Sequence, residues 1–320
     1  MISPKQWIDR SDDVHRQANL LQDWGQAYSQ LGSGCFAGSV TTFHFAGLKV
    51  FRETMNRAVF QAGGLPSGRL AFGLQVRGRG PTCICGEEGE PNSVLVFSGR
   101  SGFEFLSPDM FEFLGVELDT SPFEDSVLLA MMHDLEQALS GGSRAIALPP
   151  AKAGRLQRLL DEILSEDELD DRLCDAPGQG TAFSRGMVGQ LLDILQDADC
   201  DREGPVLRHW EAIAAIRLLV TDSDNCPLSV AELTHTIGLS RRTLQNACRS
   251  ILGMSPIQYL RALRLSEARR KLQAAGSVTE VATQFGFWHL GYFSRDYNAM
   301  FGELPSQTVQ NRVKDTRRRQ

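Results

Sequence analysis

Apolar positions change their period along the chain, and the changes predict its elements. Between residues 35 and 118, apolar side chains recur largely at every second position, as in Leu70, Phe72, Leu74 and Val76. This period is typical of half-buried β-strands. Clusters rich in Gly and Pro separate the runs at 63–68, 78–81 and 86–89, where turns are expected. The pattern predicts a small β-sandwich or barrel.

Helical spacing occupies the rest of the first 204 residues. Helices are predicted over 14–31, 123–139, 151–169 and 183–195, and the second of these should end at Gly141 and Gly142. The Leu-rich faces at 156–164 and 187–195 could mediate dimerisation or pack on the β-domain, and both alternatives stay open. An acidic, turn-rich stretch at 197–205 predicts a boundary between a sensor or dimerisation domain, 1–204, and a second domain, 205–320.

Residues 229–309 contain one pattern twice, and such a repeat defines the structural unit. The spacing is 48 residues up to the turn glycine and 49 after it. The recurring positions are Ser229 with Ser277, Val230 with Val278, Gly238 with Gly286, Leu244 with Phe293, Gly253 with Gly302, and Pro256 with Pro305. Each copy contains a short helix, a turn at Gly and a second helix, which a Gly ends before a Pro begins the next. The repeat therefore predicts an all-α domain with two helix-turn-helix units, 229–252 and 277–301, which is an arrangement that reads DNA.

The first unit presents a polar face to solvent. Ser229 is expected to cap a helix that ends at Ile237, and Ser240 a second helix over 241–252, with Gly238 in the turn. One side of the second helix is apolar. The other carries side chains that can hydrogen-bond to guanine or adenine edges, namely Arg242, Gln245, Asn246 and Arg249, with Arg241 at its start. An ordinary solvated helix face is the alternative, but the repeated helix-turn-helix favours base or phosphate contact.

The second unit has a recognition face with less charge. Its second helix is predicted over 289–301, with Phe293, Tyr297, Met300 and Phe301 facing inward. The residues predicted to contact DNA are His289, Gly291, Tyr292, Arg295 and Asn298. We expect this face to read bases less and to hold the DNA backbone more than the first.

One helix over 256–274 is predicted to join the units. Its length of about 27 Å would place two recognition helices in successive major grooves, about 34 Å apart. Four arginines on it, Arg261, Arg264, Arg269 and Arg270, are expected to be solvated or directed at phosphates.

The charge is divided unevenly along the chain. The net charge is −6, yet residues 205–320 carry 16 Lys and Arg against 9 Asp and Glu, whereas residues 1–204 carry 17 against 30. Only the second domain is therefore expected to meet phosphate. Seven cysteines without framework spacing predict free thiols in a reducing cytoplasm. The sequence shows neither a secretory signal nor an apolar run long enough to span a membrane, so a cytoplasmic protein is expected.

At its C-terminal end the sequence resembles the AraC/XylS family of transcriptional regulators. The resemblance rests on the run from Gly286 to Tyr297, GFWHLGYFSRDY, with Phe301, Gly302 and Pro305. The segments 240–247 and 287–291 further resemble the ethanolamine-operon regulator subgroup. The resemblance implies a seven-helix DNA-binding domain and an activator that contacts RNA polymerase. Its candidate effector pair is ethanolamine with a cobalamin.

Four positions depart from the family pattern. His289, Gly291 and Asn298 stand where the family often has an acidic residue, Ser and Lys. Thr234 stands where a small residue is usual. The departures affect the transfer of base contacts in the second unit more than they affect the fold.

Other classes of function are less well supported by the residues. An alkyl-accepting repair protein fused to a DNA-binding module would need an activated thiol, but Cys83 and Cys85 have no acid–base pair nearby in sequence. A buried or edge thiol is the plainer interpretation. Scattered histidines do not have the spacing of a metal site. The prediction is a protein without catalytic residues, metal or cofactor.

We therefore expect a homodimeric regulator of double-stranded promoter DNA that acts with RNA polymerase and does not bind membrane. Its first domain would bind a small-molecule effector through residues that the sequence does not identify. Alternatively that domain would have no effector, and protein partners or proteolysis would control the regulator.

Overall fold

The computed structural model describes residues 5–45, 47–99, 102–119, 126–138, 142–165, 179–195, 210–221, 226 and 229–318. The chain forms two compact units. The first contains Met1–Tyr28 and Ala37–Val206, and the second contains Ser29–Phe36 and Leu207–Gln320. The predicted boundary between 204 and 205 lies outside the described residues and stays a prediction.

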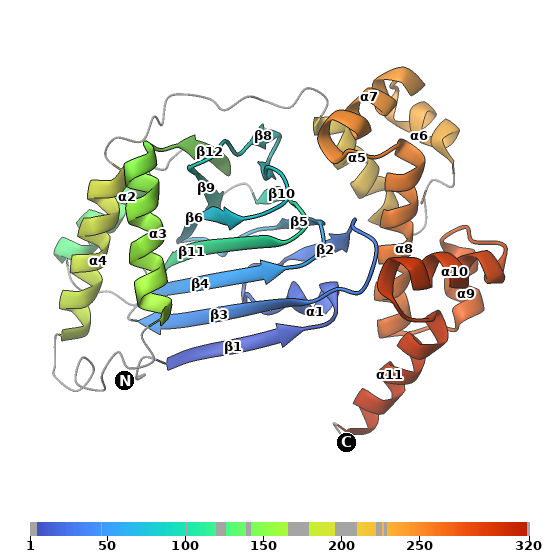
Figure 1. The fold of residues 1–320 in the computed structure, drawn as a ribbon, viewed down its shortest axis with the longest axis horizontal. Coiled ribbons are helices and arrows are strands. Elements are labelled where there is room, and N and C mark those ends of the chain that lie inside the picture. The colour runs from blue at the N-terminus through green and yellow to red at the C-terminus, as the bar shows by residue number, and fades with distance from the viewer. Residues whose placement is uncertain are drawn as a thin grey trace. The chain divides into compact units, whose positions relative to one another are not determined.

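The first unit is built on two antiparallel sheets (Figure 1). The larger sheet has the order β1-β3-β4-β11-β6-β9-β12, with strands Lys5–Ser11, Gly38–Phe45, Leu48–Met55, Phe111–Asp119, Arg69–Arg77, Ser93–Ser98 and Arg144–Ala147. The smaller has the order β2-β5-β10-β7-β8, with strands Ala27–Gln30, Val59–Gly63, Phe103–Ser107, Cys83–Ile84 and Glu87–Glu88. This architecture confirms the predicted β-rich domain.

Side chains alternate across the larger sheet because successive strand residues point to opposite faces. In the central strand β11, Val116 lies between Val50 of β4 and Phe72 of β6, and all three are buried. Their face packs with α2 (Ser126–Ala138), α3 (Pro150–Ser165) and α4 (Gln179–Leu195), which lie beside the sheet in Figure 1. One apolar core joins sheet and helices.

The Leu-rich helix faces are part of this core. Leu156 and Leu160 of α3 and Leu191 and Ile194 of α4 are fully buried in it. The structure thus supports packing on the unit's own sheet, and a homodimer stays a prediction. The described parts of the predicted helices agree with α2, α3 and α4, while 123–125, 139 and 166–169 lie outside the described residues.

Aromatic rings fill the space between the two sheets. Phe97 of the larger sheet lies 4.9 Å from Phe103 of the smaller, with Trp24 5.3 Å away, measured between ring centroids. The indole Nε1 of Trp24 donates to Glu117 over 2.7 Å, and Lys49 forms an ion pair with the same carboxylate. Edge-to-face packing of this kind stabilises a core beyond the area it buries.

The predicted helix over 14–31 is wrong. Asp13 caps a single turn, α1 (Val14–Gln17), and the strand β2 begins at Ala27. Left-handed backbone at Asp23 and Gly25, with φ of +69° and +52°, prevents a helix from continuing between them. Val14, Ala18, Leu21 and Tyr28 are buried as expected, but they are buried by packing on the sheets. Strand β1 was also not predicted.

The second unit is a group of helices around one central helix. These helices are α5 (Trp210–Thr221), α6 (Val230–Ile237), α7 (Arg241–Leu252), α8 (Pro256–Ala274), α9 (Val278–Gln284), α10 (Leu290–Phe301) and α11 (Pro305–Arg318). The central helix α8 contacts all the others (Figure 1). Near its start, Tyr259 donates to the carbonyl of Ile213 in α5, and near its end Arg312 of α11 donates to the carbonyl of Leu272. The predicted all-α domain of two helix-turn-helix units is confirmed.

A carboxyl group in the first unit couples stability to pH. Glu53 is only 3% exposed, and its Oε1 accepts hydrogen bonds from Gln17 at 3.0 Å and Tyr28 at 3.1 Å. Burial raises the pKa of Glu53 to about 7, against the opposing effect of these two bonds. Between the unfolded pKa near 4.5 and the folded value, the folded state therefore holds a proton that the unfolded state releases.

We predict that stability falls as pH rises from 5.5 to 8 because of this one group. Glu53→Gln keeps an acceptor oxygen but cannot ionise. Relative to this variant, the wild-type chain should lose about 2 kcal/mol of unfolding free energy across that range, measured by urea denaturation. Glu90→Gln, at an exposed position, is the control and should follow the wild type. Parallel pH profiles for wild type and Glu53→Gln would contradict the assignment.

Candidate nucleic-acid interface

The first helix-turn-helix unit is fixed by caps and a glycine turn. The side chain of Ser229 accepts from the backbone N–H of Glu232 at the start of α6, and Ser240 accepts from that of Thr243 at the start of α7. Gly238 between the helices has φ of +73°, which a residue with a side chain rarely adopts. Leu233, Leu244, Ala247 and Cys248 are fully buried. The two caps and the turn glycine lie where the sequence predicted them, and together they hold the two helices in place.

The outer face of α7 is polar and exposed. All five residues predicted to contact DNA here are exposed: Arg241, Arg242, Gln245, Asn246 and Arg249. They supply donors and acceptors that match base edges in the major groove. With Leu244 and Cys248 anchoring the opposite side, α7 presents this face on a rigid support.

The second helix-turn-helix unit is built in the same way, and its first helix begins with a complete capping box. The Ser277 side chain and the Glu280 side chain each accept from the other's backbone at the start of α9. Gly286 turns the chain with φ of +70°. Phe285, Phe293 and Tyr297 are buried, so α10 is anchored on its inner side as α7 is.

The outer surface of α10 is more apolar than that of α7. The predicted contact residues His289, Gly291, Tyr292, Arg295 and Asn298 are all exposed. Trp288 and Leu290 are exposed as well, by 67% and 40%, and Tyr292 by 60%. Trp288 and Leu290 are not among the residues that the sequence predicted to contact DNA. The available signal was their position, two and four residues after the turn glycine Gly286.

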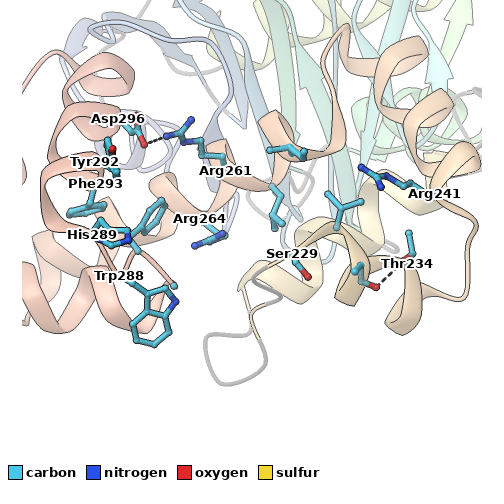
Figure 2. A pocket seen from close by; sticks show the side chains of 16 residues that line it. Ser229, Thr234, Arg241, Arg261, Arg264, Trp288, His289, Tyr292, Phe293 and Asp296 are labelled. Carbon is cyan, nitrogen blue, oxygen red and sulfur yellow. Dashed lines mark hydrogen bonds and ion pairs between the residues drawn. The ribbon is translucent and has the colours of Figure 1, made fainter.

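An open cleft of about 720 Å³ lies between the two helix-turn-helix units (Figure 2). Its walls come from α6, α7, the first half of α8 and the start of α10, and Ile257, Leu260 and Phe287 supply apolar surface. Arg241 lines it from the first unit, Arg261 from α8, and Trp288 and Tyr292 from the second. Arg261 forms an ion pair with Asp296 of α10, as Figure 2 shows. Both units thus contribute to one concave, partly basic surface.

Two arginines of α8 do not point to solvent, and the expectation for them is wrong. Arg264 is 8% exposed, its Nε donates to the carbonyl of Phe285 over 2.7 Å, and its guanidinium lies 4.5 Å from the centre of the Phe287 ring. Burial lowers the pKa of Arg264 from its usual value. These contacts tie the turn of the second unit to the central helix.

Arg269 has a similar role further along α8. It is 7% exposed, forms an ion pair with Glu303 at 2.7 Å and stacks 4.7 Å from the ring centre of Phe301. Arg261 and Arg270 are exposed, as expected. Leucine spacing identified the apolar residues of α8 but gave no sign that charged residues are buried among them.

Four of the described thiols have pKa values that burial raises, which is the opposite of the activation that a nucleophilic cysteine needs. Burial raises the pKa of Cys83, and burial also raises that of Cys85. In the C-terminal compact unit, burial raises the pKa of Cys226 to about 11 and that of Cys248 to about 12. Thiols with raised pKa values are mostly protonated at neutral pH and react poorly. The repair alternative therefore has no support from these groups.

In the described part of the chain, no group of three or more His, Cys, Asp or Glu side chains is placed to hold a metal ion. None of the described helices is both long enough and apolar enough to cross a membrane.

Comparison with known proteins finds relatives of the C-terminal compact unit. Residues 233–311 match the family of helix-turn-helix domains. The probable thc operon regulatory protein of Rhodococcus erythropolis is 37% identical over 87 residues, which are 26% of each chain. The XylDLEGF operon transcriptional activator 3 of Pseudomonas putida is 33% identical over 185 residues, 44% of this chain and 56% of the relative.

Among solved structures, a probable AraC family transcriptional regulator from Rhodopseudomonas palustris CGA009 is 33% identical. The match covers 32% of this chain and 97% of that one, with a TM-score of 0.29. The chain spans between about a quarter and just over half of the length of the curated relatives given above.

These matches define a class first: residues 233–311 are a helix-turn-helix DNA-binding domain. More particularly, this domain is similar in sequence to that of transcriptional regulators of the AraC/XylS family.

We predict that Arg264 stabilises the second unit and does not bind phosphate. Arg264→Ala leaves the Phe285 carbonyl without its donor, so the free energy of local opening of α9 and α10 should fall by about 1–3 kcal/mol. Hydrogen exchange of those amides in the full chain measures it. The control is Lys271→Ala, at an exposed cation of the same helix, which should change it by less than about 0.5 kcal/mol. Unchanged protection together with weaker DNA binding would restore the phosphate role.

Proposed function

We propose that this protein is a sequence-specific transcriptional regulator that binds promoter DNA with α7 and α10 in two successive major grooves. The observation that carries the proposal is the exposed polar face of α7 on a capped, anchored helix. Arginine pairs with guanine and Asn or Gln with adenine by two hydrogen bonds each. Such side chains aligned on the second helix of a helix-turn-helix fit base recognition.

The central helix supports binding in two grooves. The 19 residues of α8 make a rod of about 28 Å, and successive major grooves on one face of DNA are about 34 Å apart. Buried contacts of Arg264 and Arg269 fix the second unit to this rod. The cleft between the units, with Arg241 and Arg261 on it, would then face the DNA backbone between the grooves.

Control of DNA binding is assigned to the N-terminal compact unit, which contains the two β-sheets. A cavity of about 450 Å³ there is lined by Trp7, Asp9, Leu20, Gln22, Thr42, His44 and Lys49. Trp7 and His44 pack edge to face at 5.5 Å. Burial, and after it the charge of Lys49, lowers the pKa of His44, so its ring is neutral at pH 7 and offers one donor and one acceptor. An apolar wall with converging polar groups favours a small-molecule effector.

The resemblance makes ethanolamine with a cobalamin the first effector pair to test. A ligand that binds only the folded state raises stability by about 2.7 kcal/mol at 100 times its dissociation constant. We expect one of the pair to raise the melting temperature of the full chain, and Trp7→Ala to reduce that shift. No shift with either compound, alone or together, would favour control by protein partners or proteolysis.

The mode of regulation is proposed by extension. The relatives in Pseudomonas putida are described as transcriptional activators. We extend this to an activator that acts with RNA polymerase, as a homodimer on paired sites, in the cytoplasm that holds the chromosome.

Arg249→Ala tests base recognition by the first helix-turn-helix unit. If Arg249 binds a guanine by two hydrogen bonds, the variant should lose about 1–3 kcal/mol on the specific site and relax the preference at one base pair. Affinity for the specific site and for random DNA, compared at one salt concentration, measures both effects. Arg270→Ala should leave the preference intact. An equal loss on both DNAs would mean that Arg249 contacts phosphate.

A further inference from the structure

The two recognition helices differ most where each begins. With the 49-residue spacing of the repeat, Arg241 and Arg242 of α7 correspond to Leu290 and Gly291 of α10, and Thr243 corresponds to Tyr292. Two exposed cations are thus replaced by an exposed leucine and a glycine. The first residues of the second helix are those that contact base edges in a helix-turn-helix. The two units therefore present different chemistry to DNA at the same place.

The exposed apolar residues at and just before the start of α10 are not part of the domain's buried core. Trp288, Leu290 and Tyr292 are exposed, whereas the α10 core is made by Phe293, Tyr297 and their neighbours. A side chain at Gly291 would meet nothing within 4 Å, so internal packing does not require glycine there. Exposed apolar groups of this size usually mark a surface that another molecule covers.

Charge around this surface indicates nucleic acid as its partner. The guanidinium of Arg295 lies 4.9 Å from the ring centre of Tyr292, and Arg241 and Arg261 line the adjoining cleft. The surface also continues from the exposed face of α7 through that cleft. An apolar patch bordered by cations suits a groove whose walls are phosphates and whose floor carries apolar groups.

In the major groove, the C5 methyl of thymine is the apolar group among the base edges, and apolar side chains recognise it. We propose that the second helix-turn-helix unit reads thymine methyl groups through Leu290 and Tyr292, while the first unit reads bases by hydrogen bonds. The inference rests on the proposed function. It replaces the expectation that this face mainly holds the backbone, because Arg295 is the one cation among the residues predicted to contact DNA on α10.

Replacing thymine by uracil in the DNA tests this directly, since uracil lacks the methyl but keeps every hydrogen-bonding group. The full chain is titrated, at one stated salt concentration, with its natural site and with duplexes that carry uracil in either half-site. A half-site here is the segment of DNA that one helix-turn-helix unit contacts. The second half-site is the one whose base preference Arg249→Ala leaves intact. Uracil there should weaken binding roughly fourfold for each methyl lost from a contact. Uracil in the first half-site should change affinity less than twofold.

Leu290→Ala provides the matched variant, because Leu290 is exposed and its loss should not disturb folding. It should bind the natural site more weakly and lose most of its sensitivity to uracil. Arg249→Ala is the control and should keep the full sensitivity. Tyr292→Phe, which retains the ring, should behave like the wild type.

The outcomes separate this inference from the function on which it rests. Specific binding that is insensitive to uracil, or a second half-site without a shared thymine, overturns the inference and leaves the regulator intact. Leu290→Ala with unchanged affinity and unchanged sensitivity also overturns it, and the apolar surface would then be assigned to a protein partner. Absence of any sequence-specific binding would remove the proposed function itself.

Discussion

The DNA-binding unit depends on the burial of charged groups along its central helix. Arg264 and Arg269 of α8 lose most of their contact with water on folding. A backbone carbonyl, a carboxylate and aromatic faces replace that contact. A buried guanidinium is costly unless such partners are all in place. These partners lie in the turn before α10, at its last residue and just after it, so the contacts fix the orientation of α10 relative to α8. With Arg261 paired to Asp296, three arginines of one helix define where the second recognition surface lies.

The same sequence repeat produces two different surfaces on this shared support. The cap of the first helix, the turn glycine and the buried positions are reproduced in both copies, because each copy must form the same pair of packed helices. The outward positions carry no such constraint, and there the copies diverge from polar in α7 to apolar in α10. Function is therefore encoded in the positions that the fold leaves free, as expected when recognition sites are carried by a common fold.

Much of the second unit could be predicted from the sequence, because its signals are local. Ser240 and Gly253 mark the ends of α7, and Gly286 marks the turn before α10. The roles of Arg264 and Arg269 could not be predicted, since they depend on partners 21 and 34 residues away. The prediction of a helix over 14–31 was wrong for the same reason, because the structure there depends on long-range contacts. Val14, Ala18, Leu21 and Tyr28 fit one helical face, but long-range packing on the sheets buries them. Among site residues, the exposure of Trp288 and Leu290 needed the structure.

Footprinting of the full chain on its own chromosome, at a stated salt concentration, tests the central claim most directly. If α7 and α10 read DNA from one rigid support, the protein will occupy discrete sites with a shared motif. Each site will protect two successive major grooves on one face of the duplex. Diffuse occupancy without a shared motif would contradict the account, since it would show that the domain binds phosphate without reading sequence.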